Sequence, residues 1–303
     1  MMVFKRHGRC YQPPMDHQGT IIRPPSEANS ILLQVTLGCS HNKCDFCGAY
    51  MNKRFAIKDS ETIRKDLAFA ATHCKNQRRL FLMDGDALII PQNRLLSILA
   101  DIRTMLPWVN RIGTYASAKS LRLKSDEQLR ELKEAGIDIV YMGLESGDDV
   151  ILKAMHKNGN AQSIVEQGQR ARRAGFKLNV TVINGLGGVE RSMEHAQATA
   201  RALSAMDPEQ IGALSLMLIP GTPLHERAER GDFELPDAYG ILREIRELLA
   251  GLNLSRGLFL ANHASNYLPM KVRLPSGKAK ALAEIDAALD GERALKPEGQ
   301  RRL

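Results

Sequence analysis

From residue 31 onward, short apolar runs alternate with longer segments in which apolar residues recur every three to four positions. This alternation is typical of repeated β-α units, which form a parallel sheet covered by helices. Six units in series predict an α/β fold, a partial (β/α)6 barrel of the TIM type. The expected strands are Ile31–Leu37, Arg79–Met83, Arg111–Ala116, Ile137–Gly143, Lys177–Ile183 and Ile211–Ile219.

The segments between the strands carry helix boundary signals: Ser60 and Ser125 stand where N-cap residues belong, and Gly136 and Gly175 where helices stop. Residues 1–30 contain four prolines, so an extended N-terminal arm is expected there, followed by a core barrel at 31–220. Beyond Pro220 the pattern changes. A small α/β extension that covers the barrel is expected at 221–303, with a helix near Pro236–Gly251, an apolar run at Leu258–Ala261 and a helix at Lys278–Leu289.

The net charge of +8 is spread along the chain, and only the tail KPEGQRRL and the run from Lys271 to Lys280 are locally basic. This distribution favours a solvated surface and a frayed end, with nucleic acid and an anionic small substrate as the alternative explanations of the charge; of these, nucleic acid is not the expected partner. No stretch approaches the ~20 apolar residues of a membrane span, and the N-terminus lacks the apolar segment of a signal peptide. We therefore expect a cytoplasmic protein without a membrane span.

Three of the five cysteines, Cys39, Cys44 and Cys47, lie within nine residues, and Cys10 and Cys74 are distant. This distribution indicates a metal site in a reducing compartment rather than a disulfide framework. Three thiolates on a loop leaving a strand can hold three corners of a 4Fe-4S cluster and leave one iron open. The alternative is zinc bound by these cysteines and His41, although structural zinc motifs generally use two separated ligand pairs. No role is predicted for Cys10.

Polar or small residues also follow every predicted strand. Because loops at the C-terminal ends of the strands build the active site of a parallel barrel, we expect these residues to share one site. In chain order they are Cys39; Asp84, Gly85 and Asp86; Ser117 and Lys119; Glu145 and Ser146; Asn184 and Gly185; and Pro220, Gly221 and Thr222.

The strand order and the cysteine loop together resemble the radical S-adenosylmethionine (SAM) superfamily over about residues 31–220. Phe46 precedes the last cysteine, as is common in that family, and FLMDGDAL stands where the family has a Gly-Gly-Glu segment. The segments YMGLESGDDVILKAMHK, VTVINGLGG and LMLIPGTPLHE resemble the branch with the Elongator catalytic subunit, the methylthiotransferases and oxygen-independent coproporphyrinogen oxidase. Two departures are the C-x4-C-x2-C loop, where C-x3-C-x2-C is commonest, and Asp84-Gly85-Asp86 in place of Gly-Gly-Glu.

The resemblance implies a 4Fe-4S cluster whose open iron binds SAM, and an electron donor such as flavodoxin or ferredoxin. Reductive cleavage of SAM then gives methionine and a 5′-deoxyadenosyl radical, which abstracts hydrogen from a substrate. The additional domains and cysteines of the methylthiotransferases are not expected here, so a small-molecule substrate is favoured. An RNA-modifying enzyme of the same superfamily and a non-catalytic iron–sulfur or zinc binding module are the alternatives.

The resemblance also implies roles for single residues at the strand ends. Asp84, Gly85 and Asp86 are expected to hold the SAM amino group, unless they form a plain Asp-Gly turn. Glu145 is expected to accept hydrogen bonds from the ribose hydroxyls, or else to cap the following helix. Candidates for the methionyl carboxylate are Ser117 and Lys119, with Lys53 and Arg54 in competition. An apolar shelf under adenine is expected from Ile183, Gly185 and Leu186, with a strand-closing glycine as the alternative.

The segment after Leu258 places five hydrogen-bonding side chains within six residues, which is costly to bury without partners. It is expected to cover the barrel mouth and to contact substrate, or else to be a polar surface loop. His225, after the sixth strand, is a further candidate for acid–base chemistry. The substrate candidates in the segment are Asn262, His263, Ser265, Asn266 and Tyr267.

Overall fold

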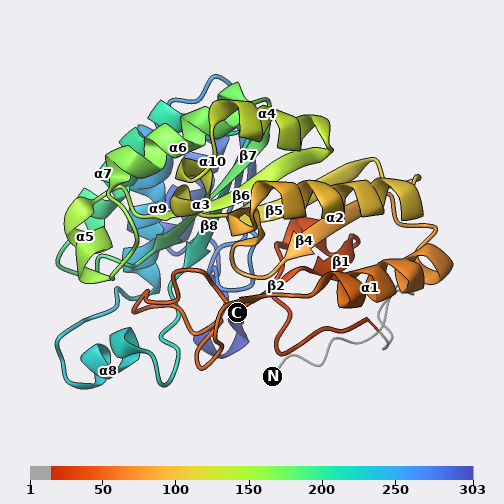
Figure 1. Ribbon diagram of the computed structural model, residues 1–303. Coiled ribbons are helices and arrows are strands. Elements are labelled where there is room, and N and C mark those ends of the chain that lie inside the picture. Colours follow the sequence, from red (N-terminus) through yellow and green to blue (C-terminus); the bar gives the residue numbers. More distant parts are fainter. Residues whose placement is uncertain (1–14, 303) are drawn as a thin grey trace. The chain divides into compact units, whose positions relative to one another are not determined.

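The computed structural model of the chain describes residues 15–302 (Figure 1). The predicted arm at 1–30 is therefore described only from residue 15, and Cys10 lies outside the described residues. Two compact units make up the described chain: the first contains residues up to 40, 49–140 and 174–176, and the second contains residues 41–48, 141–173 and 177 onward.

The first unit is built on three parallel strands, β1 (Ile31–Gln34), β4 (Arg79–Met83) and β5 (Arg111–Ala116), in the order β1–β4–β5. Leu33 pairs with Leu82, and both side chains are fully buried, as expected for a parallel strand covered on both faces. The bounds of β4 and β5 confirm the prediction. The predicted first strand is wrong beyond Gln34, because Thr36–Leu37 (β2) pairs instead with Ala56–Ile57 (β3).

Helices and the N-terminal arm surround these strands in the first unit (Figure 1). The helix α1 begins at Ser60, one residue earlier than predicted, and Asp59 rather than Ser60 is its N-cap, because the Asp59 side chain accepts a hydrogen bond from Thr62 N. The arm lies along β1, where Gln18 N donates to the side-chain oxygen of Gln34. The helical elements of this unit are η1 (Pro25–Glu27), α1 (Ser60–His73), η2 (Ala87–Ile89), α2 (Gln92–Met105), α3 (Ala118–Arg122) and α4 (Asp126–Glu134).

The strand β6 (Ile137–Glu145) begins in the first unit and ends in the second, two residues later than predicted. In the second unit β7 (Lys177–Asn184) and β8 (Gln210–Ser215) are parallel, β9 (Gly257–Leu260) continues this parallel pairing, and β10 (Lys271–Leu274) is antiparallel. Along the sheet the order is β1-β4-β5-β6-β7-β8-β9-β10. The mostly parallel, open sheet confirms the α/β class and the partial barrel.

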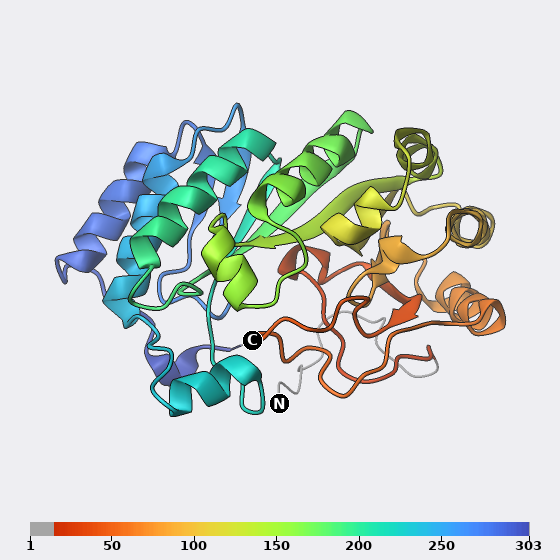
Figure 2. The same ribbon diagram turned by 60° about the vertical axis from the view of Figure 1, so that its left-hand side comes forward.

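Residues 221–302 share this second unit with β7 and β8, and β9 pairs directly with β8. Four of its helices, α6, α7, α9 and α10, lie next to one another in a row (Figure 2). None of the helices in residues 15–302 is both long enough and apolar enough to cross a membrane. The helical elements of this unit are α5 (Asp149–Ala154), α6 (Ala161–Arg173), α7 (Ser192–Met206), α8 (Pro223–Glu229), α9 (Ala238–Gly251), α10 (Lys278–Leu289) and η3 (Glu298–Gln300).

The prediction of a frayed basic tail is wrong at Arg301, whose side chain is buried. Its guanidinium donates to the carbonyl oxygens of Leu216 and Ser265, at 2.6 Å each, and to the Glu298 carboxylate at 2.8 Å. Leu216 follows β8 directly, so the tail supplies a hydrogen-bond donor to the residue after this strand. A buried guanidinium needs such partners, and here it has them.

Candidate functional site

The three cysteines of the motif are thiols with partly exposed side chains. Cys39 belongs to the first unit, and Cys44 and Cys47 belong to the second. Cys47 N donates to Cys44 O at 3.1 Å, which closes a turn around Phe46. Phe46 packs against the apolar cluster of the second unit that contains Leu186 and Leu216, so its ring holds the loop down.

Asp45, which lies inside the motif, is the main polar anchor of this loop in the second unit. Its backbone N–H donates to Met155 O, and its carbonyl accepts from Leu224 N, both at 3.1 Å. Its carboxylate lies 2.7 Å from His156 Nδ1. The sequence reasoning did not single out Asp45, because its partners are far away in the chain.

The zinc alternative required His41 as a fourth ligand. His41 Nε2 lies 2.7 Å from the carbonyl oxygen of His156, so this ring nitrogen already has a hydrogen-bond partner. Within residues 15–302, no three or more His, Cys, Asp or Glu side chains form a group that could hold a metal ion. Both the cluster and the zinc assignments therefore rest on the chemistry of the donor set, and three thiols on a short loop match an iron–sulfur cluster better.

In the first unit, Asp84 and Gly85 hold the chain just before Cys39. Asp84 has a left-handed φ of 77°, and its buried carboxylate accepts from Gly38 N at 2.9 Å, with Lys53 Nζ 3.7 Å away. Gly85 N donates to Gly38 O at 3.1 Å. A Cβ at Gly85 would lie 2.8 Å from the Cβ of Cys39, so only glycine permits this approach. These contacts make the segment more than a plain Asp-Gly turn.

Asp86 is fully buried and bound to serine side chains. Its Oδ2 accepts hydrogen bonds from Ser40 Oγ and Ser117 Oγ, both at 2.7 Å. Burial raises the pKa of the Asp86 carboxyl, and these hydrogen bonds oppose the shift. Ser117 is the N-cap of α3, with Lys119 partly exposed in its first turn. The Asp86 carboxylate thus ties the residue after Cys39 to α3.

Glu145 is the last residue of β6, two residues beyond the predicted end of this strand, and it is held by a residue that the sequence did not reveal. Lys157 Nζ donates to Glu145 Oε1 at 2.9 Å. A Cβ at Gly143 would lie 1.9 Å from the same oxygen, so glycine makes room for the carboxylate. The N-cap of α5 is Asp148, whose side chain accepts from Val150 N at 2.8 Å. The alternative role of Glu145 as the helix cap is therefore taken by Asp148.

The three residues expected under adenine differ in their surroundings. Gly185 has a φ of 87°, and a Cβ there would lie 2.6 Å from Ile241 Cδ1. Leu186 is fully buried in the apolar cluster, whereas Ile183 is only partly buried. These contacts favour the structural alternative for Gly185, which lies against Ile241 of α9, and Leu186 is part of the apolar core. Ile183 remains the apolar candidate at this strand end.

Most side chains of the predicted substrate segment form hydrogen bonds with other residues of the protein. Asn266 is fully buried; its Oδ1 accepts from Ser215 Oγ at 2.8 Å, and its Nδ2 donates to Ala213 O at 2.9 Å. Tyr267 bonds to Glu298 and Arg301, and burial raises the pKa of its hydroxyl to about 12. The buried polar groups thus have partners, and the segment fastens to β8.

Three substrate candidates keep some exposure. Asn262 is exposed, and His263 is partly buried, with burial lowering the pKa of its imidazole. His263 Nδ1 lies 2.9 Å from Ser265 Oγ. His225 lies in α8 with Nδ1 3.5 Å from the Glu229 carboxylate, and Arg54, the competing cation of the first unit, is exposed.

A cluster of three polar side chains, Ser146, His195 and Glu244, is buried where β6 and β7 end. The sequence did not reveal the last two. His195 of α7 places Nδ1 2.7 Å from Ser146 Oγ, and its Nε2 3.1 Å from Ile183 O and 3.4 Å from the Glu244 carboxylate. Glu244 of α9 accepts from Gly185 N at 2.6 Å. The helix periodicity could have revealed Glu244, since it shares the apolar face of Ile241 and Leu248.

Burial shifts the pKa values of this pair in opposite directions. It lowers the pKa of His195 from 6.5 to about 4 and raises the pKa of Glu244 from 4.5 to about 7. The raised carboxyl pKa gives stability below pH 4.5 that is lost as the pH rises to about 7. The lowered imidazole pKa gives stability above pH 6.5 that is lost as the pH falls to about 4. Between pH 4.5 and 6.5 the two slopes cancel.

Glu244→Gln is therefore expected to make stability depend on pH in that window. The amide keeps the hydrogen bonds but does not titrate, so only the histidine slope remains. Relative to wild type, the free energy of unfolding should fall by up to about 1.4 kcal/mol for each pH unit between about 6.5 and 4.5. Urea unfolding of both proteins across this range measures the difference, in which other titrating groups cancel. A difference that stays constant with pH would contradict the assignment.

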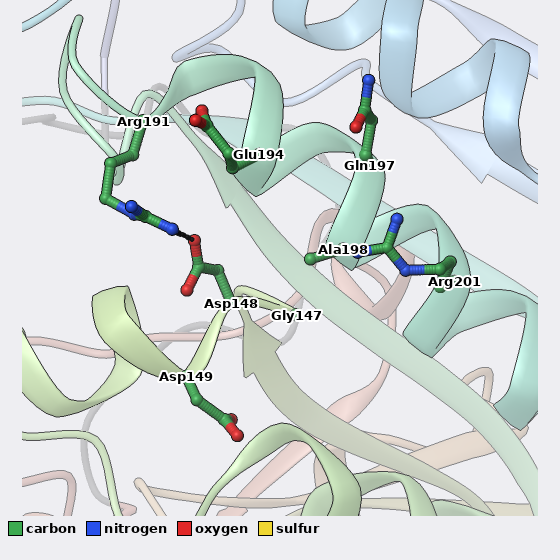
Figure 3. Close-up of a pocket in the computed structure, with 8 residues that line it drawn as sticks. All are labelled: Gly147, Asp148, Asp149, Arg191, Glu194, Gln197, Ala198 and Arg201. Atoms are coloured by element: carbon green, nitrogen blue, oxygen red, sulfur yellow. Dashed lines mark hydrogen bonds and ion pairs between the residues drawn. The ribbon is translucent and has the colours of Figure 1, made fainter.

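A cavity of about 330 Å³ opens beside the N-terminal ends of α5 and α7 (Figure 3). Arg191 extends toward Asp148 and donates to its carboxylate at 2.7 Å, while Asp149 accepts from Ala161 N. None of the predicted site residues lines this cavity. Asp148 caps α5 and pairs with Arg191, and Asp149 binds the first residue of α6, so these three charged residues have structural roles.

The chain is similar in sequence to known proteins. A model of the Radical SAM superfamily matches residues 33–203. The heme chaperone HemW of Bacillus subtilis is 21% identical over 203 residues, which are 65% of this chain and 53% of the relative. The biotin synthase of Stenotrophomonas maltophilia strain K279a is 26% identical over 215 residues, 71% of this chain and 60% of the relative. The chain thus spans between half and two thirds of these relatives.

Solved structures show the same fold at low identity. Coproporphyrinogen III oxidase (HemN) from Escherichia coli has a TM-score of 0.54 and 16% identity, covering 73% of this chain and 51% of that chain. Elp3 of the archaeon Methanocaldococcus infernus has a TM-score of 0.51 and 13% identity, covering 88% of this chain and 64% of that chain. Both resemble this chain in fold.

Proposed function

The chain belongs to the radical SAM superfamily, and from this premise we propose that it is an enzyme that binds a 4Fe-4S cluster through Cys39, Cys44 and Cys47. Bound together, the cluster and SAM supply a 5′-deoxyadenosyl radical that abstracts hydrogen from the substrate. The observation that carries the proposal is the match of the family model over 33–203, a range that contains the whole C-x4-C-x2-C motif.

Within this function, the residues after β4 would hold the amino group of SAM. Both oxygens of Asp86 already accept hydrogen bonds, Oδ2 from two serine hydroxyls and Oδ1 from Ser117 N at 3.2 Å. We therefore assign the contact to the backbone carbonyls of the Asp84-Gly85-Asp86 segment rather than to the Asp86 carboxylate. Gly85 suits this role because it already lies against Cys39 without a side chain.

Glu145 and Lys157 would serve the nucleoside part of SAM. The Lys157 ammonium donates to one carboxylate oxygen of Glu145 at 2.9 Å, and the second oxygen would accept hydrogen bonds from the ribose hydroxyls. Lys119, partly exposed in the first turn of α3, remains the candidate cation for the methionyl carboxylate. Ile183 would supply apolar contact at the end of β7.

The substrate that we propose is a small molecule, because the positive charge is not gathered into the basic stripe that nucleic-acid binding requires. The reaction takes one electron from a reductant, and a flavodoxin or a ferredoxin is the proposed donor. A thiol-rich cluster site suits a reducing compartment, so the proposed location is the cytoplasm.

The proposal is tested by anaerobic reconstitution with iron and sulfide. We expect about four irons per chain, as a cubane requires, and formation of 5′-deoxyadenosine when SAM and dithionite are added. Chromatographic quantification of the nucleoside measures turnover, with reaction mixtures lacking dithionite as the control. Stoichiometric zinc with negligible iron, after anaerobic purification from iron-replete cells, would contradict the proposal and support a zinc-binding module.

A further inference from the structure

The His195 imidazole connects the C-terminal ends of two neighbouring strands. One ring nitrogen contacts Ser146, the residue after β6, and the other contacts Ile183, the penultimate residue of β7. Glu244 extends the connection, since it accepts from Gly185 N and lies 3.4 Å from the imidazole. Helices α7 and α9 thus reach both strand ends through a single buried ring.

The hydrogen bonds require one tautomer of the ring. His195 Nε2 faces two acceptors, the Ile183 carbonyl and the Glu244 carboxylate, so it carries the proton. Nδ1 then accepts from the Ser146 hydroxyl, whose oxygen in turn accepts from Asp148 N at 3.0 Å. Every member has the partner that its chemistry demands, so the group specifies one arrangement of the two strand ends.

The group resembles a catalytic Ser-His-Glu triad in composition, but its burial excludes that role. Ser146, His195 and Glu244 each expose 1% or less of their surface. A nucleophile without solvent access cannot meet a substrate. Nearby at the two strand ends, Glu145 retains 9% exposure and Ile183 is partly buried.

We propose that His195 is a positioning residue for the adenosine part of SAM, because it fixes Glu145 on β6 relative to Ile183 on β7. This inference rests on the proposed function. A ribose acceptor and an apolar surface for adenine come from different strands, so their spacing must be set before SAM binds. The buried imidazole sets this spacing through its hydrogen bonds to the two strand ends, without touching the cofactor.

The test compares SAM binding to reconstituted variants by anaerobic equilibrium dialysis. His195→Leu removes both links, and its Kd for SAM should rise on the order of tenfold, as expected for losing a preset hydrogen-bonding geometry. His195→Gln keeps a donor for Ile183 and should lose less. If neither His195 variant folds, Ser146→Ala removes only the link to β6, and it should raise the Kd for SAM by less than the roughly tenfold expected for losing both links.

The matched control lies on the same strand, at its opposite end. Asn179 of β7 is also buried and donates to the Gln210 side chain at 3.0 Å. Asn179→Ala removes a buried hydrogen bond far from Ser146 and Ile183, so it should lower stability without changing the Kd for SAM. Equal losses of affinity in this control and in His195→Gln would overturn the proposal, because they would show a general effect of destabilisation.

Two further measurements separate positioning from direct contact. If His195 acts through Glu145, the double variant with Glu145→Ala should bind SAM no more than about twofold worse than Glu145→Ala alone. In the protein without cofactors, His195→Gln should speed amide exchange at Asp148 and Gly185 more than at the strand cores. Additive losses, or unchanged affinity in a folded His195→Leu, reject the inference alone. Absence of SAM binding by wild type rejects the proposed function itself.

Discussion

Cys44→Ala is expected to abolish both the cluster and the formation of 5′-deoxyadenosine. With two thiolates left of three, the reconstituted variant should retain less than about one iron per chain, against about four in wild type. Turnover should fall to the level measured without dithionite, because no cluster remains to pass an electron to SAM. Iron analysis and the nucleoside assay measure the two effects on the same sample.

The matched control for this substitution is Lys43→Ala, one residue earlier in the same loop, where the side chain is exposed. It should keep its iron and its turnover, since an exposed ammonium is not a ligand of a cluster. Asp45 anchors this loop with three hydrogen bonds, two of which are made by its backbone. Neither substitution removes them, so the loop should fold in both variants. A Cys44→Ala protein that keeps four irons would refute the ligand assignment.

Glu145→Ala is expected to weaken SAM binding roughly ten- to hundredfold, and Glu145→Gln by less. Charge-assisted hydrogen bonds contribute about 1.5–3 kcal/mol each, and alanine removes the acceptor for the ribose hydroxyls altogether. Glutamine keeps one acceptor but loses the attraction of Lys157. Iron content should stay near the wild-type value in both variants, because Glu145 is not a cluster ligand. Equilibrium dialysis with SAM gives the affinities.

The control for Glu145 is its neighbour Asp148, which performs the structural work at this strand end. Asp148→Ala removes the N-cap of α5 and the partner of Arg191, so it should cost about 1 kcal/mol of stability. Its affinity for SAM should remain close to that of wild type. If Glu145→Ala instead binds SAM normally and melts lower, the ribose assignment is wrong and the carboxylate is structural.

The fold was largely predictable because its local signals agree with its burial. β4 and β5 have the predicted bounds, since each is a short apolar run buried on both faces. Ser125 caps α4 through a capping box with Gln128, and Gly136 after this helix adopts the left-handed φ that the stop signal implied. Where the prediction was wrong, as beyond Gln34, pairing with β3 decided the structure, and no local pattern encodes that partner.

The site was less predictable because its polar contacts join distant residues. Lys157 contacts Glu145 from the segment that follows α5, and His195 contacts Ser146 across 49 positions of sequence. A charged or polar side chain looks solvated in the sequence until its partner is known. The predicted roles of the cysteines and of Glu145 come from the motif resemblance, and they stay predictions until the variants are measured.

Arg301 has a consequence for how the chain matures on the ribosome. The end of β8 and the segment around Ser265 are synthesised well before the residue whose guanidinium satisfies their carbonyls. Domains generally begin to fold while synthesis continues, but the second unit reaches its final hydrogen-bonded state only after translation has passed codon 301. A nonsense mutation shortly upstream of that codon would therefore leave Leu216 and Ser265 with unsatisfied carbonyls and yield a product exposed to proteolysis.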